Sequence, residues 1–214
     1  MSARLPKSVT DVEYRLLAIA AAQVSKNALA AAEGGICVDF GEMNKILALH
    51  ARDLDVVVQP GVGWEDLNEL LAKEQLFFPP DPGPGAQIGV MIGTRCSGIN
   101  WSRYGTMKEW ALSVTAVLAD GTTVKTRHRP RKSSTGYDLT RIFVGSGELW
   151  MVTEAALKIT SRPENVQAAV ASFPSSQDAL NTVIKVVQRG IQVAALELLD
   201  ETTMKAVNQS GYCI

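Results

Sequence analysis

The alternation of apolar and polar positions divides the first part of the chain into a helix and two strands. Val12 to Ala32 is rich in Ala and Leu and contains neither Gly nor Pro, which predicts a helix ending at Gly34-Gly35. Ile36 to Phe40 then has the pattern of a short strand. Asp55 to Gln59 contains three consecutive valines, a pattern typical of a strand buried on both faces.

An amphipathic helix is predicted after this second strand. Pro60-Gly61 ends the strand, and four large apolar residues follow at helical spacing: Trp64, Leu67, Leu70 and Leu71. Glu65 and Asp66 lie in the first turn, where the helix dipole favours negative charge. The pattern therefore predicts a unit made of a strand, a turn and a helix.

Residues 79–89 form a segment of a different kind. They hold four of the nine prolines, so their backbone is expected to form neither a helix nor a regular strand. We expect a stiff, ordered loop. Further along, Ser113 to Leu118 and Thr122 to Thr126 flank Asp120-Gly121, which is a strong hairpin signal. Val152 to Ile159 is a further predicted strand.

Pro163 marks a predicted domain boundary. Beyond it, Val166 to Phe173 and Ile191 to Leu199 have strand patterns, and Ser175 to Arg189 has the pattern of a helix between them. Ser175 and Asp178 form a capping pattern at the start of that helix, and another helix is expected near Glu201. A strand, a helix and a strand do not close a core alone, so we expect this second domain to be cut short.

Composition and charge narrow the class of protein. The chain is 46% apolar and 20% charged, which predicts a globular protein with a real core. Its formal charge of −1 lacks the basic excess that nucleic-acid binding requires, and no apolar run approaches the ~20 residues of a membrane span. Three distant cysteines and two histidines support neither a disulfide framework nor a zinc site, so we assign no metal.

Small residues gather between residues 81 and 105, a stretch we call the small-residue segment. Such a stretch lets the backbone approach a flat or charged ligand closely and leaves N–H groups and hydroxyls available to it. Composition alone fits a set of tight turns as well as a cofactor cradle. Neither the dinucleotide-binding pattern nor the P-loop pattern occurs, so those phosphate sites are not indicated.

Five sequence motifs occur in a specific order along the chain. They are Pro-Pro-Asp-Pro-Gly-Pro-Gly-Ala-Gln-Ile-Gly (79–89), Cys-Ser-Gly-Ile-Asn (96–100), Arg-Tyr-Gly-Thr-Met (103–107), Ala-Asp-Gly-Thr (119–122) and Arg-Lys-Ser-Ser-Thr-Gly-Tyr-Asp-Leu-Thr (131–140). Together and in this order, they resemble the flavin-binding domain of cytochrome-linked D-lactate dehydrogenases, within the PCMH-type, or vanillyl-alcohol-oxidase-like, flavoproteins.

The resemblance implies an α+β fold: a PCMH-type FAD-binding domain of two subdomains, followed by the start of a ferredoxin-like substrate domain. We expect a divergent helical segment at 1–33, the FAD-binding domain at 34–162 and an incomplete substrate domain at 163–214. The implied activity is oxidation of D-lactate or a similar D-2-hydroxy acid by hydride transfer to FAD. Electrons would pass on to cytochrome c, and the implied compartment is the mitochondrion.

The resemblance also implies a set of cofactor-binding residues. Carried over position by position, they are Pro80, Asp81, Ile88, Gly89, Thr94, Cys96, Ser97, Gly98, Asn100, Tyr104, Gly145, Ser146 and Val152. A small buried hydrophobe is an equally good interpretation of Cys96, and a core aromatic of Tyr104 and Trp101. We regard His50 and His128 as ordinary surface residues and assign no catalytic residue.

The sequence departs from the family at three places. Ala18 to Ala32 stands where the family has a Gly-rich segment that wraps the pyrophosphate. Residues 145–151 are one residue shorter than the family's loop and carry a bulky Trp150, which would occupy cofactor space. The resemblance implies that the family's metal-binding histidines and its general base lie beyond Ile214. Two alternatives therefore remain open: an inactive, truncated remnant, and a relative that acts on glycolate or 2-hydroxyglutarate.

Overall fold

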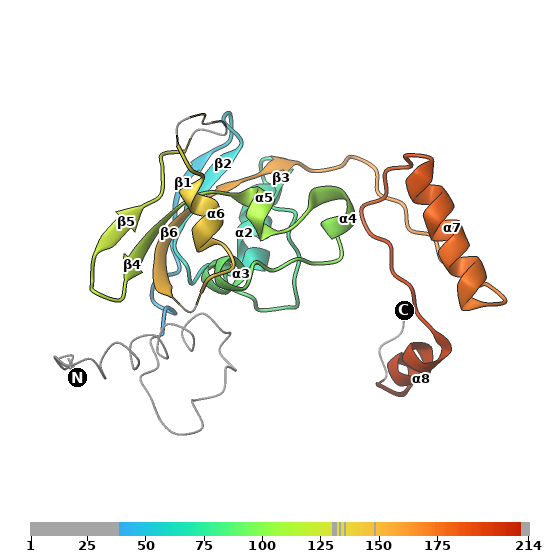
Figure 1. The fold of residues 1–214 in the computed structure, drawn as a ribbon. Helices are drawn as coiled ribbons and strands as arrows, with labels where there is room; N and C mark the ends of the chain where they lie inside the picture. Colours follow the sequence, from blue (N-terminus) through green and yellow to red (C-terminus); the bar gives the residue numbers. More distant parts are fainter. Residues whose placement is uncertain (1–38, 130–131, 133, 135, 148, 211–214) are drawn as a thin grey trace, which may run out of the picture.

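A five-stranded antiparallel sheet forms the centre of the molecule (Figure 1). The computed structural model describes residues 39–129, 132, 134, 136–147 and 149–210. The sheet has the order β1-β2-β6-β4-β5. Its strands are β1 (Ile46–His50), β2 (Asp55–Val58), β6 (Trp150–Lys158), β4 (Ala111–Leu118) and β5 (Thr123–Lys125). The helix expected at Val12 to Ala32 lies outside the described residues.

Strand β6 joins the two halves of the sheet because it pairs with β2 on one side and with β4 on the other. Its Ala155 lies opposite Val58 of β2 and Val114 of β4, and all three side chains are buried. Strand β2 is thus an interior strand between β1 and β6, which explains its unbroken valine run. The predicted strands at 55–59 and 152–159 are confirmed.

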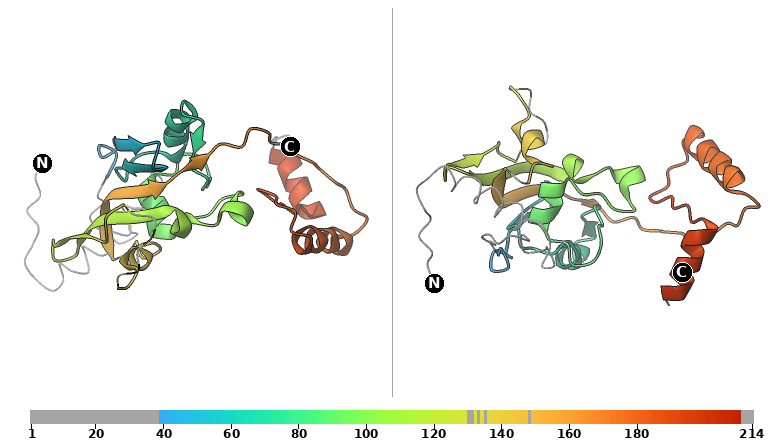
Figure 2. Two further views of the ribbon diagram at one scale, coloured as in Figure 1. Left: turned by 90° about the horizontal axis from the view of Figure 1, so that it is seen from above. Right: turned by 60° about the horizontal axis from the view of Figure 1, so that its bottom comes forward.

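Helices cover both faces of this sheet. Figure 2 shows α2 (Trp64–Ala72) on one side and α6 (Leu139–Phe143) on the other. Leu67 and Leu71 of α2 are fully buried, as their spacing predicted. Three further short helices complete this part: α3 (Ile88–Thr94), α4 (Trp101–Tyr104) and α5 (Met107–Trp110). A small second sheet pairs β3 (Leu76–Phe77) with β7 (Thr160–Ser161).

The predicted hairpin is confirmed between β4 and β5. Gly121 has a φ of 87°, a conformation that glycine adopts without strain, and the Thr122 amide donates to the Asp120 carboxylate at 2.8 Å. Local turn chemistry is therefore enough to place this connection.

Two predictions in the first half need correction. Of the strand predicted at Ile36 to Phe40, residues 36–38 lie outside the described residues, and Asp39 and Phe40 belong to no strand. The strand that pairs with β2 is β1, which the sequence analysis missed. Strand β1 lies at the sheet edge with a bulge between Ile46 and Ala48, and its Leu47 is exposed, so its apolar pattern is weak. The loop expected at 79–89 is confirmed to Gln87, after which α3 begins at Ile88.

The C-terminal part lies apart from the sheet as two helices, α7 (Ser176–Gln188) and α8 (Glu201–Ser210) (Figure 2). The predicted cap is confirmed, because the Ser175 hydroxyl accepts from the Asp178 amide at 3.2 Å. The strands predicted at 166–173 and 191–199 are wrong: neither segment pairs with a strand among the described residues.

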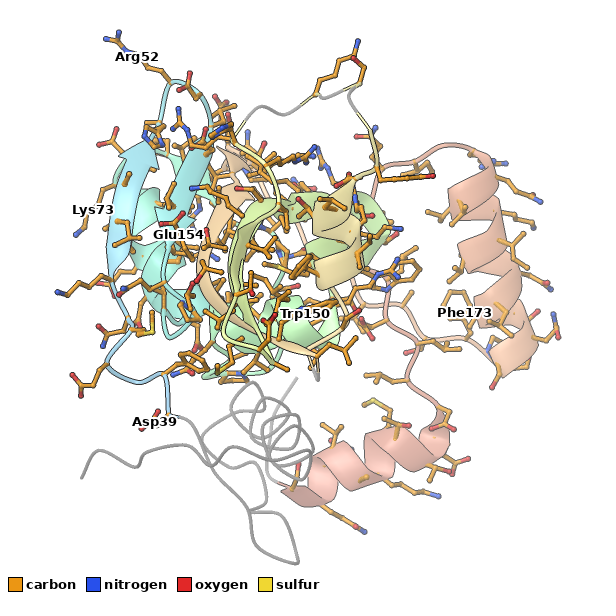
Figure 3. All side chains as sticks on the ribbon, turned by 60° about the vertical axis from the view of Figure 1, so that its left-hand side comes forward. Asp39, Arg52, Lys73, Trp150, Glu154 and Phe173 are labelled. Carbon is orange, nitrogen blue, oxygen red and sulfur yellow. The ribbon has the colours of Figure 1, made fainter. Side chains whose placement is uncertain are left out.

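The exposure of these two segments explains why they do not form strands. Val166 is 78% exposed and Val170 is 90% exposed. A strand needs a neighbour for its N–H and C=O groups and a core for its apolar face, and neither is present here. Figure 3 shows side chains crowded within the body and side chains of α7 and α8 projecting into open space. No helix in the described part of the chain is both long and apolar enough to cross a bilayer.

A buried carboxylate ties the end of the β1-β2 hairpin to the segment after β5. Asp55 is 4% exposed, and its Oδ1 lies 2.8 Å from His50 Nδ1 and 3.1 Å from Arg129 Nη1. His50 is therefore half-buried and paired rather than an ordinary surface residue, whereas His128 is exposed. A buried carboxylate is stable only when it is paired in this way.

Candidate functional site

The small-residue segment is built around α3, whose first amides are engaged by the segment after β2. The Ile88 amide donates to the Val62 carbonyl at 2.9 Å and the Gly89 amide donates to the Pro60 carbonyl at 2.8 Å. A Cβ on Gly89 would lie 2.7 Å from the Pro60 Cβ, so only glycine fits there. Because these amides are occupied, they are not available to a ligand.

The chain turns sharply at the C-terminal end of α3. Arg95 adopts the left-handed conformation with a φ of 52°, and the Cys96 amide donates to the Met91 carbonyl at 3.0 Å. The Cys96 carbonyl then accepts from the Met107 amide at 2.9 Å, which fixes Cys96 between α3 and α5.

Cys96 is partly buried against the core at this position. Burial raises the pKa of its thiol to about 12, and the nearby Asp81 carboxylate adds to the rise. Cys96 therefore behaves as a small, protonated side chain rather than as a nucleophile.

The proline-rich loop and the segment after Cys96 are joined by Asp81 and Asn100. Asp81 Oδ1 accepts from the Asn100 amide at 3.1 Å, and Asp81 Oδ2 accepts from Asn100 Nδ2 at 2.9 Å. Burial raises the pKa of Asp81, the Asn100 amide acts in the opposite direction, and the Glu197 carboxylate adds to the rise. A Cβ on Gly98 would lie 2.1 Å from Asp81 Oδ1, so the two segments meet as closely as glycine permits.

Backbone donors are available between Cys96 and Asn100. Within the described part of the chain, the amide N–H groups of Ser97, Gly98 and Ile99 donate no hydrogen bond. Ser97 and Ile99 are exposed and Gly98 is partly exposed, so the three amides belong to a surface segment. Three consecutive free amides beside small side chains suit a group that is rich in acceptor oxygens.

A distant segment meets the end of α3. The Gly145 amide donates to the Ile92 carbonyl at 2.9 Å, and the Gly147 amide donates to the Gly93 carbonyl at 3.1 Å. Gly145 has a φ of 93°, and a Cβ there would lie 3.1 Å from the Arg95 Cβ. The structure thus brings residues 145–147 beside the start of the free-amide stretch.

Trp150, which the sequence analysis placed in cofactor space, lies in the core. It is 8% exposed, its ring centroid lies 4.1 Å from that of Phe143, and its Nε1 donates to the Phe143 carbonyl at 3.3 Å. Figure 3 labels Trp150 within the crowded body. Its side chain therefore fills space under α6 and not the exposed surface beside Ser97.

The thirteen residues expected to bind the cofactor differ in their exposure. Four are buried and reach a ligand at most through their backbone: Pro80, Ile88, Gly89 and Val152. Three are exposed, namely Thr94, Ser97 and Gly145, and six are partly exposed, namely Asp81, Cys96, Gly98, Asn100, Tyr104 and Ser146.

The two aromatic residues that the sequence analysis interpreted as possible core residues also differ in exposure. The Tyr104 ring packs edge-on against Phe77 at 5.4 Å, whereas Trp101 is 59% exposed and is not a core residue.

Sequence reasoning missed two features of this site. It did not find that the amides of residues 97–99 are free, because hydrogen-bond partners are invisible in a sequence. It also assigned no role to Arg95, although Arg95 is exposed and makes the turn that directs the chain toward Ser97.

Comparisons with known proteins agree on one family. The family model described as FAD binding domain matches residues 13–127, which is more than half of the chain. The model described as FAD linked oxidases, C-terminal domain, matches residues 162–212.

Curated relatives are similar over most of this chain. The D-lactate dehydrogenase [cytochrome], mitochondrial, of Arabidopsis thaliana is 43% identical over 209 residues, which cover 97% of this chain and 37% of the relative. The protein of the same name from Kluyveromyces lactis is 52% identical over 79% of this chain and 30% of its own length. This chain thus spans about a third of the length of these relatives.

A solved structure supports the fold. An alkyldihydroxyacetonephosphate synthase structure is 21% identical with a TM-score of 0.67, and the match covers 89% of this chain and 37% of that one. At this identity the likeness concerns the fold alone.

Proposed function

This chain belongs to the FAD-binding domain family, and from that membership we propose that it forms the flavin-holding part of an FAD-dependent D-2-hydroxy-acid dehydrogenase, with D-lactate as substrate. The proposed arrangement is an FAD-binding domain at residues 34–162 and the beginning of a substrate domain at residues 163–214. The C-terminal family match from residue 162 supports that boundary.

The free amides at residues 97–99 are the observation that carries the proposal. FAD has a diphosphate, ribityl hydroxyls and a ring with carbonyl oxygens, all of which accept hydrogen bonds from backbone N–H groups. Small side chains at Ser97 and Gly98 allow such a group to approach the backbone closely. The residues present therefore fit the cofactor at this surface.

The residues proposed to hold the cofactor are Ser97 and Gly98 of the expected set, together with Ile99. The Ser97 hydroxyl and the three amides would donate hydrogen bonds to it, and residues 145–147 flank them at the end of α3. The exposed Arg95 adds a positive charge at that end, which suits a diphosphate. When bound, FAD supplies a hydride acceptor for the hydroxyl-bearing carbon of the substrate.

A titration of this chain with FAD tests the proposal. We expect saturable binding with quenched flavin fluorescence, a yellow protein after gel filtration, and protection of residues 96–100 from hydrogen exchange. Folded protein that stays colourless and shows no change in flavin fluorescence would refute the binding function. Riboflavin serves as the comparison ligand, since it has the ring but not the diphosphate.

The substrate and the electron acceptor need a separate assay. The names of the relatives support D-lactate as substrate, a cytochrome as acceptor and the mitochondrion as compartment, and we propose cytochrome c as that cytochrome. The test is dye reduction by FAD-loaded protein with D-lactate, L-lactate, glycolate and D-2-hydroxyglutarate, followed by cytochrome c in place of the dye. Because no general base is assigned in this chain, we expect slow turnover that is highest with D-lactate, and a preference for glycolate or D-2-hydroxyglutarate would reassign the substrate.

A further inference from the structure

Asp81 and Asn100 make a complete set of hydrogen bonds with each other. Both carboxylate oxygens of Asp81 accept from Asn100, one from its backbone and one from its side chain. Asn100 Nδ2 also lies 3.4 Å from the Pro79 carbonyl, so that side-chain atom faces two acceptors and must be the nitrogen. Neither oxygen of Asp81 is left without a donor.

The backbone on both sides of this pair is restrained independently. Asp81 stands between Pro80 and Pro82, and a residue before proline is confined to extended conformations. Cys96 is fixed through its amide and carbonyl, at the other end of the free-amide stretch. Residues 97–99 therefore run between two anchored points, Cys96 and Asn100.

Charge makes Asp81 a poor direct ligand for an anionic cofactor. Its carboxylate would repel a diphosphate, and the Glu197 carboxylate contributes further negative charge near it. The Asp81–Asn100 pair is therefore better suited to a role other than direct contact with the cofactor.

We propose that Asp81 and Asn100 are positioning residues, whose paired side chains hold residues 97–99 in the conformation that presents three amides to the cofactor. This inference rests on the proposed function and changes the role of two expected ligands. Asp81 acts through Asn100 and does not itself contact the cofactor.

An exchange of the two side chains tests the pairing. In Asp81→Asn, one N–H group of the new amide must face a donor of Asn100, whichever way the amide is turned. In Asn100→Asp, two carboxylates face each other. In the double variant Asp81→Asn/Asn100→Asp, the residue 100 amide still donates to residue 81, the new side-chain amide donates to the new carboxylate, and the net charge is unchanged.

We expect each single variant to weaken FAD binding about tenfold and the double variant to recover part of that loss, since the hydrogen bonds between residues 81 and 100 are restored while the 3.4 Å contact with the Pro79 carbonyl is lost. Fluorescence titration measures the dissociation constants, and the visible spectrum of the bound flavin reports its surroundings. The spectrum is expected to shift in the single variants and to recover in the double variant.

Asn68→Ala is the matched control. Asn68 also makes two hydrogen bonds with one partner, since its Nδ2 donates to the Phe78 carbonyl at 3.0 Å and its Oδ1 accepts from the Phe78 amide at 2.7 Å. Phe78 remains held by its fully buried ring. We expect this variant to lower the melting temperature and leave FAD affinity within about twofold.

Three results would overturn the inference. The first is a double variant that binds FAD no better than the weaker single variant, and the second is an Asn68→Ala protein that loses as much affinity as the single variants. The third, unchanged affinity in both single variants, would also exclude a positioning role. If the original chain takes up no FAD, the proposed function fails and this inference fails with it, whereas the first three results leave FAD binding itself intact.

Discussion

The substitution Gly98→Ala tests the closest backbone approach in the candidate site. An added Cβ would lie 2.1 Å from Asp81 Oδ1, 2.3 Å from the Asp81 carbonyl oxygen and 2.4 Å from its carbonyl carbon. Ordinary contact begins at 3.4 Å, so the Asp81 backbone must move away by about 1.1 Å, the difference between 3.4 Å and the 2.3 Å to its carbonyl oxygen. Because two of the three contacts are with backbone between prolines, a side-chain rotation does not relieve them.

Separating the two segments lowers the stability of the fold, because it breaks hydrogen bonds between them. Bonds of 3.1 and 2.9 Å between Asp81 and Asn100 do not survive an opening of that size. Hydrogen bonds to a charged group contribute about 1.5–3 kcal/mol each, and water replaces part of this because Asp81 is only partly buried. We therefore expect a loss of about 2–3 kcal/mol in the free energy of unfolding, or about 5–10 °C in melting temperature.

Thermal unfolding followed by circular dichroism measures this effect, with Gly83→Ala as the matched control. Gly83 lies in the same proline-rich loop, and a Cβ there meets no atom within 4 Å. Alanine at an unstrained glycine position stabilises a protein by about 0.4–1 kcal/mol, so the control is expected to melt at the original temperature or slightly above it. A Gly98→Ala protein that melts within about 2 °C of the control would refute the close approach.

Three further predictions concern other parts of the chain. Because the pKa of the Cys96 thiol is about 12, its alkylation by iodoacetamide is expected to be slow at pH 8 and to become about tenfold faster with each pH unit. Rapid labelling of the Cys96 peptide at pH 8, measured by mass spectrometry, would contradict this. The pKa of the Glu109 carboxyl is lowered overall. Burial raises this pKa, but hydrogen bonds from the Thr106 amide and hydroxyl and the charge of Arg141 lower it by more. The stabilising contribution of Glu109 is therefore present above pH 4.5 and is lost as the pH falls through the lowered pKa. Thr106 and Glu109 form a capping box at the start of α5, in which each side chain bonds a backbone amide of the other's turn. Glu109→Gln should accordingly flatten the fall of melting temperature below pH 4.5, and an unchanged acid profile would count against this capping box. Asp55→Ala should lower the free energy of unfolding in urea by about 1–3 kcal/mol, because it removes two charge-assisted hydrogen bonds while His50 and Arg129 become hydrated. An unchanged urea midpoint would show that the contacts of Asp55 with His50 and Arg129 are dispensable for stability.

Some elements were predictable because their cause lies within a few residues. The α2 helix follows from the spacing of its leucines, the β4-β5 connection from Asp120-Gly121, and the start of α7 from Ser175. The proline-rich loop was equally predictable, since each proline removes a donor and fixes φ wherever it stands.

The errors share one cause, which is pairing between distant segments. The segment 166–173 has a local strand pattern but no neighbouring strand in the described part of the chain. Strand β1 has a weak pattern, yet it forms because β2 offers it an edge to pair with. A strand pattern states a preference, and the partner decides whether it is realised.

By itself, the sequence determined the family, through motifs whose order and spacing are specific, and the local turns, caps and helix faces that short-range chemistry dictates. Only the tertiary structure decided how the candidate site is assembled. Asn100 meets Asp81 across 19 positions, and Gly145 meets the end of α3 from a separate part of the chain. Which amides are left free, and which carboxylate is already paired, depends on these long-range contacts, because a hydrogen bond exists only when folding brings donor and acceptor within about 3 Å.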